Sequence, residues 1–189
     1  GWTMSQREQW RNDAVVLDLF EGGHWNPENT ISWLRRQGPS VWHELARGFH
    51  WGNSGVGPLR AIVEFPNCDR ATVMSIFALA TPDYYEDELA SGKKPEVMDQ
   101  PDRFIVAILD AISDGFSSGM YMSARYRCIE DPEAWSDYYF KRQSEGKPCR
   151  WRLPRRAFEP TQGLHHEPAY VLQHDRFLIP FEQWRSCAA

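Results

Sequence analysis

The chain has 189 residues and a formal net charge of −5, with 42% hydrophobic and 14% aromatic residues. This length suits one domain with its own core, and the aromatic content excludes global disorder. The mild acidity argues against nonspecific nucleic-acid binding, and no apolar run approaches the roughly 18 residues of a membrane span. We therefore expect a single domain over residues 1–189 that binds neither nucleic acid nor membrane.

The first part of the chain predicts a series of helices. Capping residues or prolines are followed by apolar residues three or four positions apart, which is the helical period. The residues expected to open these helices are Ser5, Asn26, Ser40, Pro58, Asp69 and Asp102. The residues expected to end them are Gly22, Gly38, Gly52, Pro66, Thr81 and Asp114.

Residues 83–101 interrupt this series. They are polar, begin with acidic residues and contain Gly92, Pro95 and Pro101, which are typical of turns. We predict a long surface loop here, with one helical turn near residues 86–90.

The period changes after residue 119. Residues 121–129 alternate between apolar and polar types, which predicts a strand. A short helix should follow Asp131, and residues 170–172 and 177–179 are typical of a hairpin. The predicted fold class is mainly α (α+β), with a helical part over about 4–118 and a small antiparallel sheet with C-terminal elements over about 119–189.

The sequence contains no complete catalytic pattern. His43 and His50 lie seven residues apart, whereas a zincin helix needs histidines four apart to reach one metal. The glycine-rich stretch 52–57 lacks the Lys-Ser/Thr of a P-loop, and no G-x-S-x-G motif is present. We predict no catalytic residue and no cofactor. An enzyme with a dispersed site, such as His50, Cys68 and Asp69, stays an alternative.

The histidines give no clear metal-site pattern. His165-His166-Glu167 contains the H-x-E half of a zinc deaminase signature but lacks the downstream P-C-x-x-C. Imidazoles of His165, His166 and His174 could hold a surface Zn²⁺, although loop histidines usually face solvent. We predict no metal ligands.

The cysteines and the N-terminus bear on the compartment. We expect no secretory signal, because the first residues contain neither a positively charged stretch nor an apolar run. The cysteines are too widely spaced for a zinc site, and they are expected to be free thiols: Cys68, Cys128, Cys149 and Cys187. A cytoplasmic location is the simplest reading of these features.

The most suggestive surface feature is an acidic, tyrosine-rich segment. Its carboxylates would attract a basic partner, and its tyrosines offer stiff contact area with a polar tip. The alternative is a solvated loop whose tyrosines pack on the local core. The candidate partner-binding residues are Asp83, Tyr84, Tyr85, Glu86, Asp87 and Glu88. Replacing the four acids with serine is expected to leave thermal stability nearly unchanged.

A basic cluster surrounds Trp151. It consists of Arg150, Arg152, Arg155 and Arg156. Such a cluster could bind an anion or nucleic acid, but pairing with the protein's own acidic surface is the simpler expectation.

Several short motifs resemble a small bacterial domain family of unknown function. They are Trp42-His43-Glu44-Leu45-Ala46, Phe49-His50-Trp51, Pro58, Ile62, Pro66-Asn67-Cys68-Asp69, Ile76-Phe77 and Gly119-Met120-Tyr121. The resemblance covers roughly residues 40–131, and His50 stands where the family usually has Asn. It implies a fold but no chemistry, together with a loose association with bacterial toxin immunity.

These features together predict a non-catalytic binding protein. Its partner would be a cognate protein toxin or another basic protein, which it would neutralise by occlusion as an immunity protein. A structural or adaptor module and an enzyme with a dispersed active site are the alternatives.

Overall fold

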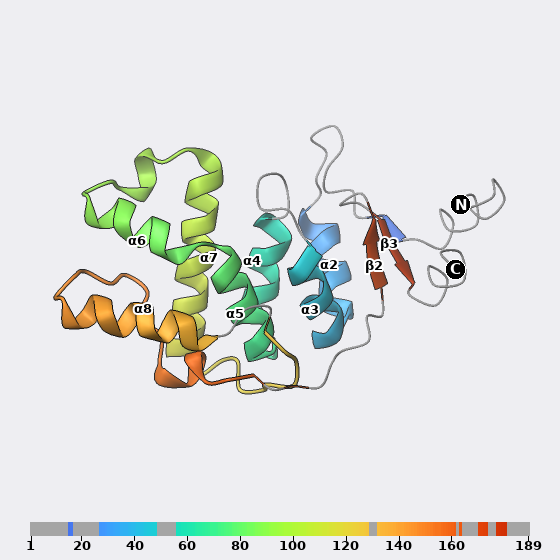
Figure 1. Ribbon diagram of the computed structural model, residues 1–189. Helices are drawn as coiled ribbons and strands as arrows, with labels where there is room; N and C mark the ends of the chain where they lie inside the picture. The colour runs from blue at the N-terminus through green and yellow to red at the C-terminus, as the bar shows by residue number, and fades with distance from the viewer. Residues whose placement is uncertain are drawn as a thin grey trace.

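The computed structural model describes residues 15–16, 27–48, 56–128, 132–161, 163, 170–173 and 177–180, with side chains over 31–46, 57–128, 132–161 and at residue 163. These stretches contain seven α-helices and two 3₁₀ helices (Figure 1). The α-helices are α2 (Pro27–Arg36), α3 (Pro39–Gly48), α4 (Val56–Glu64), α5 (Arg70–Leu79), α6 (Pro82–Ala90), α7 (Gln100–Ser117) and α8 (Pro132–Ser144). The 3₁₀ helices are η1 (Pro95–Val97) and η2 (Arg155–Phe158).

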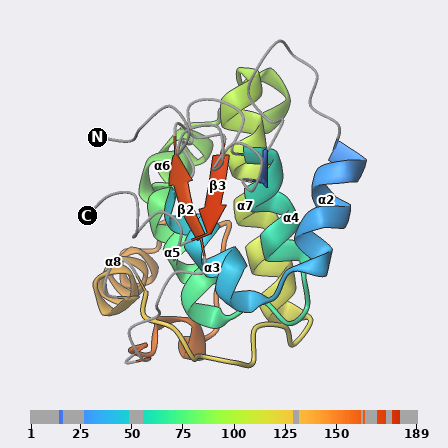
Figure 2. The same cartoon turned by 90° about the vertical axis from the view of Figure 1, so that its right-hand side faces the viewer.

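Helix α5 lies at the centre of the packing. Its residues 70–78 are all buried, and it contacts α3, α7, α8 and η2. Helices α4 and α7 pack side by side next to it (Figure 1 and Figure 2). A helix that is buried on every side must be apolar or small nearly all round, and the sequence RATVMSIFAL meets this condition after its first residue.

The predicted starts of three helices are confirmed, those of α2, α5 and α8, whereas α3 and α4 begin before the predicted Ser40 and Pro58. Helix α2 begins at Pro27 and α8 at Pro132, directly after the predicted capping positions. Asp69 is the N-cap of α5, and its Oδ1 accepts the backbone N–H of Ala71 at 2.9 Å. Helix α7 begins earlier than predicted, because Asp99 rather than Asp102 occupies its N-cap position.

The predicted fold class is wrong. The residues whose side chains the structure describes contain helices and irregular segments but no strand, so this part of the protein is all-helical rather than α+β. The helix predicted after Asp131 is present as α8, which extends to Ser144.

The strand predicted over 121–129 is absent from the described residues 121–128, which are irregular. Their backbone groups bond to α5 and its cap instead of to a ladder. The carbonyl of Ser123 accepts the N–H of Arg70 at 2.7 Å, and the N–H of Arg125 donates to Asp69 Oδ2 at 2.6 Å. Tyr121 has a positive φ of 63° and is fully buried. This segment is therefore held by hydrogen bonds to the start of α5 and not by a neighbouring strand.

The loop predicted over 83–101 is also wrong in its first half. Helix α6 starts with Pro82 at its first position and Asp83 in its first turn, both of which favour a helix start. The preceding Thr81 adopts the left-handed conformation with φ 48°. The acidic residues made the segment resemble a surface loop, so most of this helix was not predicted. Tyr85 and Glu86 lie on its buried face.

Three short strands are traced by their backbone: β1 (Val15–Val16), β2 (Tyr170–Gln173) and β3 (Phe177–Pro180). They pair antiparallel in the order β1-β3-β2. Their side chains lie outside the described set. Val15 and Val16 fall within the helix predicted from Ser5, which is therefore wrong at these two residues, and the rest of that prediction lies outside the described residues.

Candidate partner-binding surface

The six predicted partner-binding residues lie on two opposite faces of α6. Each helical residue is rotated by about 100° from the one before, so a run of six cannot face one way. Tyr85 and Glu86 point inward and are 5% and 2% exposed. The outer face consists of Asp83, Tyr84, Asp87 and Glu88.

The outer face of α6 combines an exposed aromatic ring with carboxylates. Tyr84 is 52% exposed and packs edge-on against the ring of Tyr85, with centroids 5.0 Å apart. Glu88 Oε2 pairs with Lys93 Nζ at 3.2 Å. The Asp87 side chain is 74% exposed, although it also contacts a buried arginine. This face is therefore acidic, partly paired within the chain and open to solvent.

The inner face of α6 holds the helix to the rest of the protein. The Glu86 carboxylate accepts the N–H of Arg150 at 3.0 Å and the N–H of Trp151 at 3.1 Å. The Tyr85 hydroxyl donates to Asp102 Oδ1 at 2.9 Å. Burial and the Asp102 hydrogen bond raise the pKa of Tyr85, so its hydroxyl keeps its proton. These two residues therefore fix the helix and are not available to a partner in this arrangement.

Arg142 ties α8 to α6 at the same place. Its side chain is 4% exposed, and its Nη1 donates to Asp87 Oδ1 at 2.8 Å and to the Tyr138 hydroxyl at 3.1 Å. Its Nε donates to the carbonyl of Pro148 at 2.9 Å. A buried guanidinium is tolerated only when its N–H groups are bonded, and here three acceptors meet this need.

The predicted pairing of the arginine cluster with the protein's own acidic surface is confirmed for Arg150, whereas Arg156 binds no carboxylate among the described residues. Arg150 donates to both carboxylate oxygens of Asp110, at 2.9 and 3.0 Å. The fully buried Trp151 donates its Nε1–H to the same carboxylate at 2.8 Å. Arg156 bonds to the carbonyls of residues 120 and 121 and lies over the ring of Phe116. Arg150 and Arg156 therefore both contact side chains of α7, Asp110 and Phe116 respectively.

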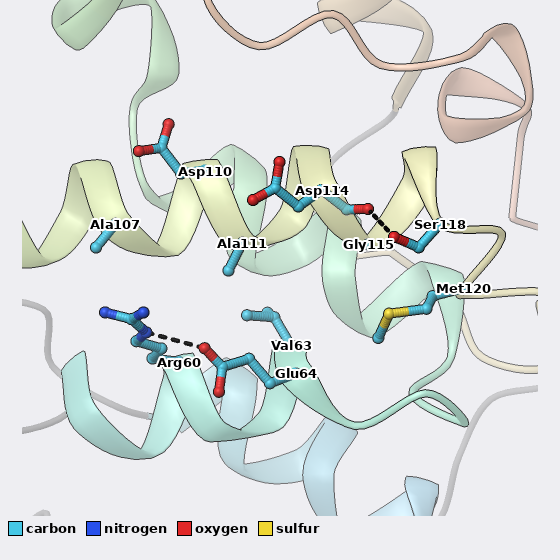
Figure 3. A pocket seen from close by; sticks show the side chains of 10 residues that line it. All are labelled: Arg60, Val63, Glu64, Ala107, Asp110, Ala111, Asp114, Gly115, Ser118 and Met120. Carbon is cyan, nitrogen blue, oxygen red and sulfur yellow. Dashed lines mark hydrogen bonds and ion pairs between the residues drawn. The ribbon is translucent and has the colours of Figure 1, made fainter.

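A groove of about 330 Å³ runs between α4 and α7 (Figure 3). Ala107 and Ala111 face α4 and leave space because their side chains are small, whereas the Asp114 carboxylate stands on the other edge of α7. Arg60 and Glu64 of α4 pair at 3.0 Å on the rim, and each side chain is about half exposed, at 52% and 53%. The groove is concave and of mixed charge, and it does not by itself select a ligand.

Two of the three residues proposed for a dispersed enzyme site, Cys68 and Asp69, have structural surroundings that do not favour catalysis. Cys68 is 1% exposed, and burial, followed by the nearby Asp69 carboxylate, raises the pKa of its thiol. A reactive cysteine needs the opposite shift, because the thiolate is the nucleophile. Asp69 is used as the cap of α5. His50 lies outside the described residues.

The remaining histidines add no assembled site among the described residues. His43 is buried, contacts the Thr72 hydroxyl through Nδ1 at 2.8 Å and stacks on the ring of Tyr126. No group of three or more metal-ligating side chains comes together within the part of the chain that is described. The candidate ligands His165, His166 and His174 lie outside that part.

One segment of the chain matches a family model. Residues 37–113 match the model of Domain of unknown function (DUF4274). The predicted resemblance to a family of unknown function is thereby confirmed for this segment. No curated protein matches the chain. No solved structure matches it either.

The matched segment does not contain the whole described core. It runs from the start of α3 into the last third of α7, and the buried Tyr121, Tyr139, Trp151 and Phe158 all lie after it. Residues beyond the segment therefore complete the packing around α5 and α7. No described helix, including the 18-residue α7, is long and apolar enough to cross a membrane.

Proposed function

We propose that this protein is a non-catalytic binding protein that recognises a basic region of a protein partner through the outer face of α6. The observation that carries this proposal is the placement of Asp83, Asp87 and Glu88 beside the exposed ring of Tyr84 on one side of a fixed helix. Carboxylates steer and orient a basic partner, while a tyrosine supplies contact area and a hydrogen-bonding tip.

The anchoring of α6 supports the proposal. A surface that is already ordered loses less conformational entropy when it binds. Glu86 and Arg142 hold α6 to the 148–151 segment and to α8, so the outer face is presented by a fixed backbone. The Tyr84 ring is also restrained by its contact with Tyr85.

The immunity role is the specific form of this function that we propose. The partner would be a cognate toxin whose basic surface is covered when α6 docks on it. The thiols of Cys68 and Cys149, which form no disulfide, agree with a cytoplasmic location, which is part of the same proposal. An adaptor module with several weak partners stays the second candidate, and it differs in that no single partner should bind with nanomolar affinity.

The test compares two triple variants that change the net charge equally. The first carries Asp83→Ser, Asp87→Ser and Glu88→Ser. The second, the control, replaces three exposed acids elsewhere. These are Glu96→Ser, Asp137→Ser and Glu159→Ser.

A partner isolated with the wild-type protein is titrated against both variants. We expect the outer-face variant to bind at least about tenfold more weakly and the control to stay within about twofold, since a lost close charge pair costs about 1.4 kcal/mol or more. Full affinity in the outer-face variant would exclude this surface. Inhibition of a toxic activity by the wild-type protein, and its loss in the variant, would support the immunity role.

A further inference from the structure

Helix α6 is joined to the rest of the protein mainly by polar side-chain contacts. Its buried residues are Pro82, Tyr85 and Glu86, whereas residues 70–78 of α5 are all buried. Among the described elements, α4 and α7 pack closely along each other, but α6 has no comparably extensive contact with any of them. Release of α6 therefore exposes much less apolar surface than release of α5, and burial of apolar surface is what holds most helices in place.

The polar contact beneath α6 centres on the Glu86 carboxylate, which accepts the backbone N–H groups of Arg150 and Trp151. The Tyr139 hydroxyl is buried and has no hydrogen-bond partner among the described residues. Burial, followed by the charge of Glu86, raises the pKa of this hydroxyl, so the hydroxyl lies near that carboxylate. An opening that admits water replaces the bonds of Glu86 by bonds to water and gives the hydroxyl a partner that it lacks. The free-energy cost of opening this polar contact is therefore small.

A residue with a positive φ flanks α6 at each end. Thr81, which precedes the helix, has a φ of 48°, and Gly92, which follows its C-cap, has a φ of 95°. A positive φ is uncommon for a residue that carries a Cβ, so Thr81 is strained in this arrangement. No atom lies within 4 Å of the place where a Cβ would stand on Gly92, so nothing packs against this turn. Hinges are formed by such residues at the ends of an element.

We propose that α6 is a releasable arm, which undocks as one unit over residues 81–92 when Glu86 leaves the N–H groups of residues 150 and 151. In the docked state the arm covers these donors and holds its outer face in place. In the released state the donors and Tyr85 are accessible to solvent. Release lowers the apparent affinity of a partner that needs the ordered outer face, because only the docked fraction is competent to bind. This last consequence alone rests on the proposed function.

The experiment is native-state hydrogen exchange of the whole chain without a partner, followed by NMR at each amide. The variants are Gly92→Ala and Glu86→Gln. The matched control is Gly119→Ala. Gly119 also follows the C-cap of a helix, α7, has a φ of 80° and has open space where a Cβ would stand. Thermal melting of each variant shows that it is folded.

A helix as short as α6 is not stable alone in water, so its amides exchange once it undocks. In the wild type we expect them to exchange at least about tenfold faster than those of α5, and the N–H of Trp151 to follow α6, because the same opening frees it. Gly92→Ala strains the docked turn and should speed the exchange of α6 by about fivefold or more, and Glu86→Gln should also speed it. Gly119→Ala should leave the exchange of α6 within about twofold of the wild type.

Three results would overturn the proposal. If the amides of α6 exchange only together with those of α5, the helix opens only by global unfolding. If the N–H groups of Arg150 and Trp151 stay as protected as α5 while α6 exchanges, the helix frays without releasing Glu86. If Gly119→Ala speeds the exchange of α6 as much as Gly92→Ala does, the turn at Gly92 is not a hinge. None of these measurements involves a partner, so they leave the partner-binding role of α6 untouched.

Discussion

The inner and outer faces of α6 show how little the local sequence says about the role of a charge. Glu86 and Asp87 are adjacent carboxylates, yet Glu86 is 2% exposed and the Asp87 side chain is 74% exposed. Glu86 bonds to the backbone of residues 150 and 151, whereas Asp87 faces water and meets one arginine at its edge. An acidic run in a helix therefore forms two surfaces, one that is buried and bonded to the rest of the protein and one that is open to solvent.

Among substitutions on the two faces of α6, replacement of Glu86 should cause the largest loss in the free energy of unfolding. Glu86→Ala leaves the N–H groups of Arg150 and Trp151 without their acceptor in a buried place. We expect a loss of about 3 kcal/mol in the free energy of unfolding, measured by urea denaturation. Glu86→Gln keeps one acceptor oxygen and should lose less. A loss below about 0.5 kcal/mol for the alanine variant would show that Glu86 contributes no more to stability than the exposed acids of α6.

This prediction replaces the expectation that serine at all four acids leaves stability unchanged. That expectation treated residues 83–88 as an exposed loop, and we no longer expect it to hold for Glu86, because this residue is buried in α6.

Arg142 and Asp87 form an ion pair between a buried and an exposed side chain. Substitutions of the two residues should lower the free energy of unfolding by unequal amounts. Arg142→Met removes a buried group that bonds to Pro148, Asp87 and Tyr138, and we expect a loss of about 2 kcal/mol. Asp87→Asn removes only the exposed partner and should lose less than about 1 kcal/mol. Urea denaturation of the two single variants and the double variant measures both losses. Equal losses would mean that Asp87 is as essential to the inner packing as Arg142.

Alkaline pH should weaken the inner packing selectively. Burial raises the pKa of Tyr85, with the Asp102 hydrogen bond as the next cause, above the ordinary value of 10.0. Above about pH 10 the unfolded tyrosine loses its proton while the folded one keeps it, so the unfolded state binds fewer protons and the stability falls as pH rises. Urea denaturation should give constant stability below about pH 9 and a decline from about pH 10 upward. The decline should be less steep in Tyr85→Phe, and an unchanged slope would show that Tyr85 ionises equally in both states.

The smallest effect on stability is expected on the outer face. Asp83→Ser and Glu88→Ser remove exposed or half-buried carboxylates, and each should change the free energy of unfolding by less than about 0.5 kcal/mol. The Lys93 pair of Glu88 is half exposed and screened by water. Thermal melting of the single variants tests this, and a large loss in either would place that residue with the inner face.

Helix starts could be read from the sequence because the interactions that create them are local. Asp69 caps α5 by accepting the N–H of Ala71, two positions later. Pro27 and Pro132 fix the backbone in the first turns of α2 and α8. The central helix α5 could be recognised for the same reason, since its apolar residues are continuous. The outer face of α6 was included in the predicted site, but only one turn of the helix, near residues 86–90, was predicted, and this turn does not separate that face from Tyr85 and Glu86.

What the sequence alone determined was therefore the helical character of α2, α3, α4, α5, α7 and α8 and the residues that begin α2, α5 and α8. The tertiary structure decided which acids are buried, why residues 121–128 do not form a strand, and which arginines pair with acids. The reason is the distance along the chain between partners: Asp69 bonds to Arg125 and Glu86 to Arg150 across 56 and 64 residues. No periodicity within a short window contains such contacts, because they form only when the helices pack.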